Sequence, residues 1–141
     1  MEVKEYVLGF LFNRAGDQVV LIEKQTPEWQ RGQLNGVGGK IEVGETPRQA
    51  MEREFAEEAG VLFQDWECII LMSGVNWRVT CFRAFDESAF MQVSSTGHER
   101  IVRCQVCDIP RYSRLDNLEM LVAIAKDRSG LIGQAVLLYG N

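Results

Sequence analysis

Hydrophobic residues form a nearly continuous run at positions 6–12, near the start of the chain. Such a run is typical of a central strand that is buried on both faces. A turn-rich segment at 13–17 separates it from a second apolar run at 19–22, so the two runs predict a hairpin. Residues 25–39 are polar and contain Pro27 and four glycines, which predicts a long loop. Loops of that length in compact domains tend to be functional.

Helix start and stop signals frame the next segment. Thr46 is suited to cap a helix, Pro47 suits its first position, and Gly60 suits the left-handed position past its end. Apolar residues recur every fourth position between these signals, at Met51, Phe55 and Ala59. The sequence therefore predicts a helix with one narrow apolar face.

Strand-like runs and a second helix pattern follow in the rest of the chain. The predicted strands lie at 66–71, 78–85 and 101–107. Asp116 with Glu119 matches a capping box at the start of a helix, whose apolar residues are Leu118, Leu121, Val122 and Ile124 and which Ser129-Gly130 would end. Because strands and helices mix without a regular βαβ rhythm, the sequence favours an α/β (α+β) fold with helices packed on a mixed sheet.

The last apolar stretch, residues 131–139, has no distinctive periodicity. It fits a sheet edge, a filler of the core or a dimer contact, and the sequence leaves these three interpretations open.

Composition restricts the class of protein. The chain has 141 residues, of which 46% are hydrophobic and 25% charged, and a net charge of −5. This length fits one domain, residues 1–141, and no apolar run approaches the roughly 20 residues that cross a bilayer. The start of the chain, 1–5, is acidic, unlike a secretory signal. We therefore expect a cytoplasmic protein that binds neither a membrane nor duplex nucleic acid, which would require a basic surface.

Four cysteines raise the question of a zinc site or disulfides. Cys104 and Cys107 form a C-x-x-C pair inside a predicted strand, where residues three apart point to opposite faces and cannot share a metal ion. Cys68 and Cys81 stand alone among apolar residues. We expect all four to be small buried hydrophobic side chains.

Three glutamates crowd the end of the first predicted helix. Glu54, Glu57 and Glu58 stand at i, i+3 and i+4, so they share about one quarter of its circumference. Two such charges 6 Å apart repel by roughly 0.7 kcal/mol in water, and the helix dipole disfavours anions in the last turn. Binding of a hard divalent cation explains why three acids stand together despite this repulsion, since magnesium prefers oxygen ligands. The alternative interpretation is a solvated acidic face. Arg53 weakens this alternative, because the Arg53 side chain can pair with Glu57 and help to fix the carboxylate rotamers.

A glycine-rich segment, 34–40, precedes that helix. Three glycines in four positions allow the backbone to approach a ligand closely. The segment is neither a P-loop nor a G-x-G-x-x-G motif, because Ile41 stands where a hydroxyl residue or the last glycine is needed.

Together these segments match a longer pattern. Gly39 is followed after five residues by Glu45, and after seven more by Arg53-Glu54-Phe55-x-Glu57-Glu58-x-Gly60-Val61. This 23-residue segment resembles the signature of the Nudix hydrolases, with Phe55 where that family more often has an aliphatic residue. Segment 34–40 further resembles the MutT-like branch. The resemblance implies an α/β/α sandwich that hydrolyses nucleoside diphosphate derivatives with Mg²⁺ or Mn²⁺.

The resemblance also implies roles for individual residues. Metal binding and water activation would fall to Glu54, Glu57 and Glu58, with Arg53 orienting Glu54, and Glu45 would serve the geometry of the loop. Further candidates are the carbonyl of Gly38 as a metal ligand and Glu99 as a ligand or base, although Glu99 also fits an ordinary loop acid. Its neighbour His98 is expected in solvent. The candidates for substrate binding are Lys24, Asn35, Gly39, Lys40 and Asn117.

Substrate class is predicted from what the chain lacks. Some subclasses of the Nudix family tend to carry a proline or a tyrosine at a position after the signature. This chain has Asn76, Trp77, Arg78 and Val79 there. We therefore expect cleavage of a nucleoside triphosphate to a monophosphate and pyrophosphate by a monomer or homodimer. The alternatives are a nucleotide sugar, a dinucleotide, an RNA 5′ end, or a non-catalytic nucleotide-binding module.

Overall fold

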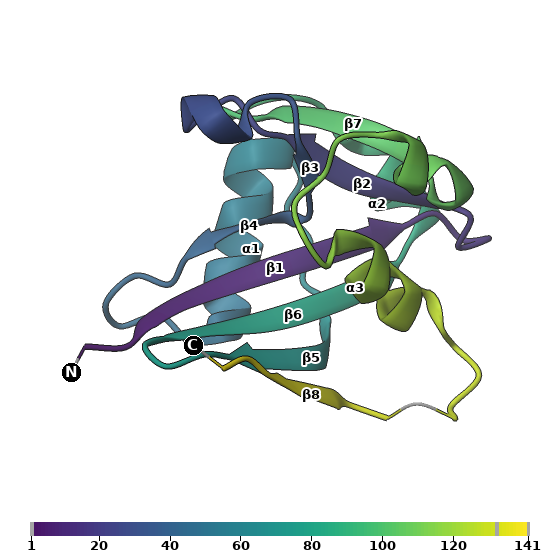
Figure 1. The fold of residues 1–141 in the computed structure, drawn as a ribbon. Coiled ribbons are helices and arrows are strands. Elements are labelled where there is room, and N and C mark those ends of the chain that lie inside the picture. Colours follow the sequence, from purple (N-terminus) through teal and green to yellow (C-terminus); the bar gives the residue numbers. More distant parts are fainter. Residues whose placement is uncertain (1, 132, 141) are drawn as a thin grey trace.

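One long strand organises the sheet. A computed structural model describes residues 2–131 and 133–140 (Figure 1). Strand β1 (Lys4–Phe12) pairs along its whole length with β6 (Trp77–Phe85) in parallel. On its other side it pairs antiparallel with β4 (Val37–Lys40) and then with β2 (Gln18–Glu23). The predicted hairpin and central strand are therefore confirmed.

Four further strands extend this sheet on both sides. Strands β3 (Leu34–Asn35) and β7 (Arg100–Gln105) both pair antiparallel with β2. Strand β5 (Glu67–Ser73) pairs antiparallel with β6, and β8 (Ala135–Leu138) pairs parallel with β5. Parallel and antiparallel ladders thus coexist, as the mixed-sheet prediction requires.

Helices cover both faces of the sheet (Figure 1). Helices α1 (Pro47–Ala59) and α2 (Glu87–Gln92) share one hydrophobic cluster with alternate residues of β1, including Val7 and Leu11. Helix α3 (Leu118–Lys126) shares a second cluster with the intervening residues of β1. Two short 3₁₀ segments complete the structure, η1 (Glu28–Gln30) and η2 (Val106–Arg111). This arrangement is the expected α+β sandwich.

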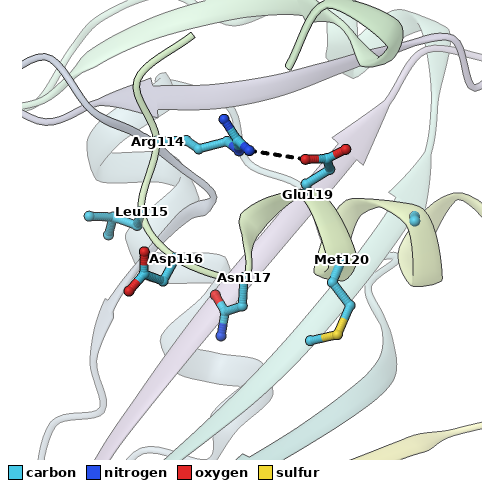
Figure 2. A pocket seen from close by; sticks show the side chains of 7 residues that line it. Arg114, Leu115, Asp116, Asn117, Glu119 and Met120 are labelled. Atoms are coloured by element: carbon cyan, nitrogen blue, oxygen red, sulfur yellow. Dashed lines mark hydrogen bonds and ion pairs between the residues drawn. The ribbon is translucent and has the colours of Figure 1, made fainter. Parts of the chain in front are cut away.

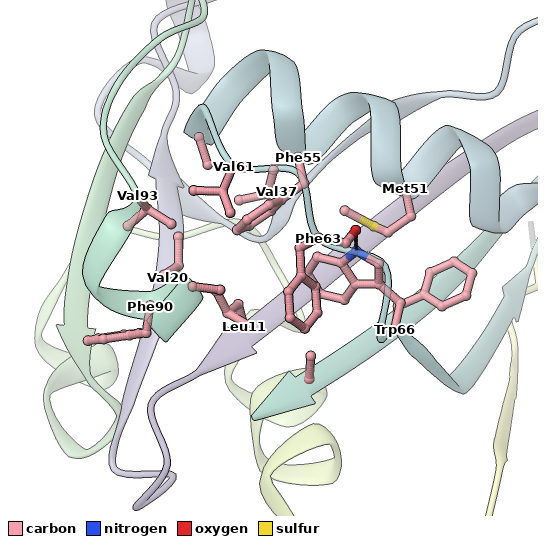
Figure 3. Packing of buried hydrophobic residues seen from close by; sticks show 14 of the residues in the cluster. Leu11, Val20, Val37, Met51, Phe55, Val61, Phe63, Trp66, Phe90 and Val93 are labelled. Carbon is pink, nitrogen blue, oxygen red and sulfur yellow. Dashed lines mark hydrogen bonds between the residues drawn. The ribbon is translucent and has the colours of Figure 1, made fainter. Parts of the chain in front are cut away.

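Helix α1 forms where its local signals predict. The Thr46 hydroxyl accepts from the Gln49 N–H and the Gln49 side chain accepts from the Thr46 N–H, which makes a capping box. Gly60 ends the helix at φ 74°. The apolar stripe of Met51 and Phe55 is fully buried, and Figure 3 shows it packed against Trp66. The catalytic candidates therefore stand on a helix that is rigidly anchored.

Long-range pairing corrects three sequence predictions. Segment 25–39 is not one loop, because its second half forms β3 and β4. The Asp116–Glu119 capping box is absent: α3 is preceded by Asn117 in the left-handed region, and Glu119 pairs with Arg114. The strand predicted to reach Cys107 ends at Gln105.

Cysteine burial also differs from the expectation. Cys81 and Cys104 are buried, Cys68 is half-buried and Cys107, on η2, is exposed. All four are free thiols. The two cysteines of the C-x-x-C pair thus lie on different elements: Cys104 is buried on β7, and Cys107 is exposed on η2.

The end of the chain supplies a sheet edge. Within 131–139 the structure shows an edge strand, β8, and its Ala135 and Leu137 also pack against the second hydrophobic cluster, so this segment is a sheet edge that also fills the core. Met1, Ile132 and Asn141 belong to the predicted domain 1–141 but lie outside the described residues. Within the described residues, none of the helices is long and apolar enough to cross a bilayer.

Candidate active site

Arg53 is the centre of the acidic edge of α1. Its Nε and Nη2 donate two parallel bonds to Glu45, of 2.6 and 2.9 Å. Its Nη1 donates to Glu54 Oε1 at 2.8 Å and lies 3.4 Å from Glu57 Oε2, while Nη2 also donates to the Lys40 carbonyl. Fork-shaped pairing of this kind fixes orientation as well as charge. Arg53 therefore ties α1 to the preceding loop and to β4, and it holds the Glu54 carboxylate in place.

The electrostatics of this edge follow from burial and from Arg53. The Glu54 side chain is 13% exposed, and desolvation raises its pKa, a shift that the hydrogen bond from Arg53 opposes. The same guanidinium lowers the pKa of Glu45 and has its own pKa raised in return. One cation thus neutralises part of a crowded group of carboxylates.

Gly39 lets Glu54 approach the backbone of β4. A Cβ on Gly39 would lie 2.6 Å from Glu54 Cδ, which is closer than side-chain carbons approach one another. The glycine predicted for close contact with a ligand therefore also accommodates the carboxylate of Glu54.

A loop that is distant in sequence wraps the end of α1. The Ser94 N–H donates to the Ala59 carbonyl at 3.0 Å, and the Thr96 hydroxyl donates to the Glu57 carbonyl at 2.9 Å. A Cβ on Gly97 would lie 2.7 Å from Glu58 Oε2, so this loop packs directly on the carboxylate. Sequence reasoning missed Thr96 and Gly97, because nothing local connects them with α1.

Glu99 lies at the end of that loop, beside Glu58. Its own N–H donates to Glu58 Oε2 at 3.1 Å. Its carboxylate accepts from the Gln25 N–H and lies 3.4 Å from Lys24 Nζ. Glu99 is only 8% exposed, so it is not a solvated loop acid, whereas His98 is exposed as expected.

The five substrate candidates line one cleft of about 360 Å³. These residues come from different segments of the chain: Lys24, Asn35, Gly39, Lys40 and Asn117. The Gly38 backbone lines the same cleft. Its apolar wall includes Leu8, Met72 and Leu121, and Tyr6 and Asp116 line it as well, none of which sequence reasoning selected. Trp77 is not among the lining residues and packs against Tyr139 instead.

A second, wider hollow of about 700 Å³ opens next to this cleft (Figure 2). Arg114 and Glu119 on its wall form an ion pair of 3.1 Å, and residues 115–117 line both spaces. We place the candidate site in the smaller cleft, because Gly39 there contacts Glu54.

The donor set at this site consists of carboxylate and carbonyl oxygens, which suits a hard divalent cation. Across residues 2–131 and 133–140, no three or more His, Cys, Asp and Glu side chains are grouped as a ready-made metal site. The glutamates of α1 are instead held by Arg53 and by loop 94–99, so they would have to turn toward a shared ion.

Comparison with known proteins decides the family. A family model of the NUDIX domain matches residues 4–112, which is most of the chain. The chain belongs to the NUDIX domain family. The matched residues contain the whole acidic edge of α1, loop 94–99 and most of the cleft. Asn117 and the rest of the C-terminal segment lie beyond them.

Individual known proteins are similar to this chain in sequence or in fold. The chain is 33% identical to the 8-oxo-dGTP diphosphatase of Escherichia coli K12 over 61 residues, 43% of this chain and 46% of that protein. It therefore spans about half the length of this curated relative. A MutT structure from a study of Aliivibrio salmonicida and Vibrio cholerae has a TM-score of 0.72 at 22% identity, with 86% of this chain and 97% of that chain covered. A NUDIX hydrolase from Nitrosomonas europaea has a TM-score of 0.78 at 18% identity, with coverage of 100% and 81%.

Proposed function

We propose that this Nudix protein hydrolyses a nucleoside triphosphate to a nucleoside monophosphate and pyrophosphate. One observation carries the proposal: Gly39 lines the cleft and also contacts the half-buried carboxylate of Glu54. Acids that could activate water thus adjoin a cleft whose glycine backbone and lysines suit a polyphosphate.

Magnesium or manganese is the metal that this donor set fits. We assign it to Glu54, Glu57, Glu58 and Glu99, with the carbonyl of Gly38. When bound, such an ion neutralises the polyphosphate, polarises phosphorus and acidifies the attacking water. The chain's own residues position these groups: Arg53 orients Glu54, and the N–H of Glu99 orients Glu58. Glu54 and Glu99 are the two candidates for the base that accepts the proton of water.

The substrate assignment divides the cleft in two. Lys24 and Lys40 would contact phosphates, while Asn35 and Asn117 would contact the base. The name of the E. coli relative, a diphosphatase of 8-oxo-dGTP, supports a triphosphate substrate for this chain. The wider hollow beyond residues 115–117 favours one second candidate, a larger nucleoside diphosphate derivative such as a nucleotide sugar, a dinucleotide or an RNA 5′ end.

A product screen tests this function. We expect Mg²⁺-dependent release of pyrophosphate from at least one triphosphate in a panel of canonical, oxidised and methylated nucleotides, with no release in EDTA. Chromatography of the nucleotide product distinguishes loss of pyrophosphate from loss of a single phosphate. If only nucleotide sugars or dinucleotides are cleaved, the second candidate replaces the first. If a nucleotide binds tightly and none is cleaved, the protein is a binding module.

The contact between Gly97 and Glu58 gives a separate prediction. Gly97→Ala places a methyl group where the Glu58 carboxylate lies, so the loop or the carboxylate must shift. We expect about a tenfold increase in the Mg²⁺ concentration needed for half-maximal activity, a size typical of lost support for metal ligands. Gly133→Ala is a control for the loss of a loop glycine, because a Cβ there meets no atom within 4 Å and the backbone of Gly133 is not in the left-handed region. Unchanged Mg²⁺ dependence in Gly97→Ala would show that the loop does not position Glu58.

A further inference from the structure

Strand β8 is the last strand on one side of the sheet, and its outer edge is open. Among the described residues it pairs with β5 alone, and Figure 1 shows it in yellow at the outer edge of the sheet. The Tyr139 N–H donates to the Ser73 carbonyl of β5, so the N–H of Tyr139 points toward β5. Successive residues of a strand direct their peptide groups to opposite sides, so those of Val136 and Leu138 point outward. These outward groups are donors and acceptors that a further strand can bind.

The side chains of β8 are apolar on both faces of the sheet. Ala135 and Leu137 pack against the second hydrophobic cluster, which includes residues of α3. Val136 and Leu138 point to the opposite face, where they are 61% and 78% exposed. Leu71, the β5 residue that pairs with Val136, is also exposed on that face. Leu71, Val136 and Leu138 therefore form an apolar patch that reaches the open edge.

This edge lacks the features that usually keep sheet edges apart. Proteins protect edge strands with charged side chains, prolines or bulges. Residues 129–141 contain neither a charged residue nor a proline, although the whole chain has a net charge of −5. By contrast, β7 on the opposite side of the sheet carries Arg100 and Arg103. Charges that would repel a second copy of the chain are therefore absent from β8 itself.

The pattern of β8 is complementary to its own reverse. Antiparallel pairing of two copies, centred on Leu137, places Leu137 opposite Leu137 of the second copy and Val136 opposite Leu138. Val136 and Leu138 are the residues with outward peptide groups, so each such pair can exchange two hydrogen bonds. The same pairing brings the apolar patches of the two copies together on one face. A second copy thus matches β8 in hydrogen bonding, in charge and in the character of its side chains.

We propose that β8 is a homodimer interface, at which two copies of the chain join their sheets through antiparallel β8 strands. A strand of 4 residues is a small contact compared with standard interfaces, which bury roughly 1,200–2,000 Å². We therefore expect a reversible dimer with a dissociation constant on the order of 0.1 mM. The interface does not depend on the proposed hydrolysis, because no residue of β8 lines the cleft.

Sedimentation velocity and amide hydrogen exchange test this interface on the unaltered chain. Between about 0.01 and 1 mM we expect the mean mass to rise from that of one chain toward that of two. Exchange of the Val136 and Leu138 amides should slow by about tenfold when nine-tenths of the chain is dimeric, since only the monomer exposes them. The Leu137 amide, which faces β5, should exchange slowly at every concentration.

Val136→Lys should raise the dissociation constant by about 100-fold or more, because it places two lysines in the contact of each dimer. Leu62→Lys is the matched control, since Leu62 is 90% exposed and lies outside β8, and it should leave the dissociation constant unchanged. Slow exchange of the Leu137 amide in Val136→Lys verifies that β8 stays on β5. If that protection is lost, exchange in the unaltered chain decides alone.

Two results would overturn the proposal. One is a chain that stays monomeric up to about 1 mM. The other is a dimer in which the Val136 and Leu138 amides exchange as fast as in the monomer, because its contact would then lie elsewhere.

Discussion

Glu57→Gln should lower kcat for the best nucleotide substrate by on the order of 100-fold or more, while the protein stays folded. The glutamine keeps the size of the side chain and its place in α1, but it removes one negative charge from the proposed metal site. Loss of one electrostatic group at a reacting centre typically costs 10²–10³ in rate. The Glu57 side chain is 55% exposed and its contact with Arg53 is 3.4 Å long, so we expect little change in stability.

Glu52→Gln is the matched control for this experiment. Glu52 lies on the same helix, outside the acidic group that Arg53 and loop 94–99 contact. We expect Glu52→Gln to retain wild-type turnover, and both variants to show the wild-type circular dichroism spectrum. If Glu57→Gln turned over as fast as Glu52→Gln, the glutamates of α1 would not take part in the reaction.

The sequence predicted those elements whose signals are local. Helix α1 is the clearest example, because Thr46, Gly60 and the four-residue spacing of Met51 and Phe55 act within the segment itself. The helical spacing of i, i+3 and i+4 likewise placed Glu54, Glu57 and Glu58 on one edge of that helix. The central strand was also evident, since burial on both faces leaves an uninterrupted apolar run.

The errors share a non-local cause. The glycines of segment 34–40 were read as loop, but β4 forms because β1 offers it a partner. The start of α3 was misplaced because its preceding segment is bound to β3: the Leu34 N–H donates to the Ser113 carbonyl, and the Leu115 N–H donates to the Leu34 carbonyl. In place of the expected capping box, Asn117 precedes α3 in the left-handed region.

The site shows the same division between local and distant signals. A family signature located the acids of α1, and single residues such as Lys24 and Asn117 were selected by resemblance. Their meeting in one cleft depends on the sheet order, which brings segments far apart in the chain together. Gly97 could not be found from the sequence, since its relevance comes only from its contact with Glu58.

Arg53→Ala should affect both activity and stability. We expect kcat to fall by about 10–100-fold, the usual cost of removing a group that orients a metal ligand. Glu54 would lose the donor that holds its carboxylate and that opposes the rise of its pKa on burial. The free energy of unfolding should fall by about 1–3 kcal/mol, because Arg53 is largely buried and its charged hydrogen bonds join α1, the preceding loop and β4. Thermal unfolding and steady-state kinetics at several Mg²⁺ concentrations measure the two effects.

Arg53→Lys separates charge from geometry in this experiment. Lysine keeps the positive charge but cannot donate two parallel bonds to Glu45. We therefore expect Arg53→Lys to recover only a small part of the lost kcat. Arg78→Ala controls for loss of an arginine from an ion pair, since Arg78 is exposed and pairs with Glu5 at 3.7 Å, and it should change neither quantity measurably. Full activity in Arg53→Lys would mean that positive charge alone is enough to support Glu54. Full activity in Arg53→Ala would show that Arg53 has no role in the reaction.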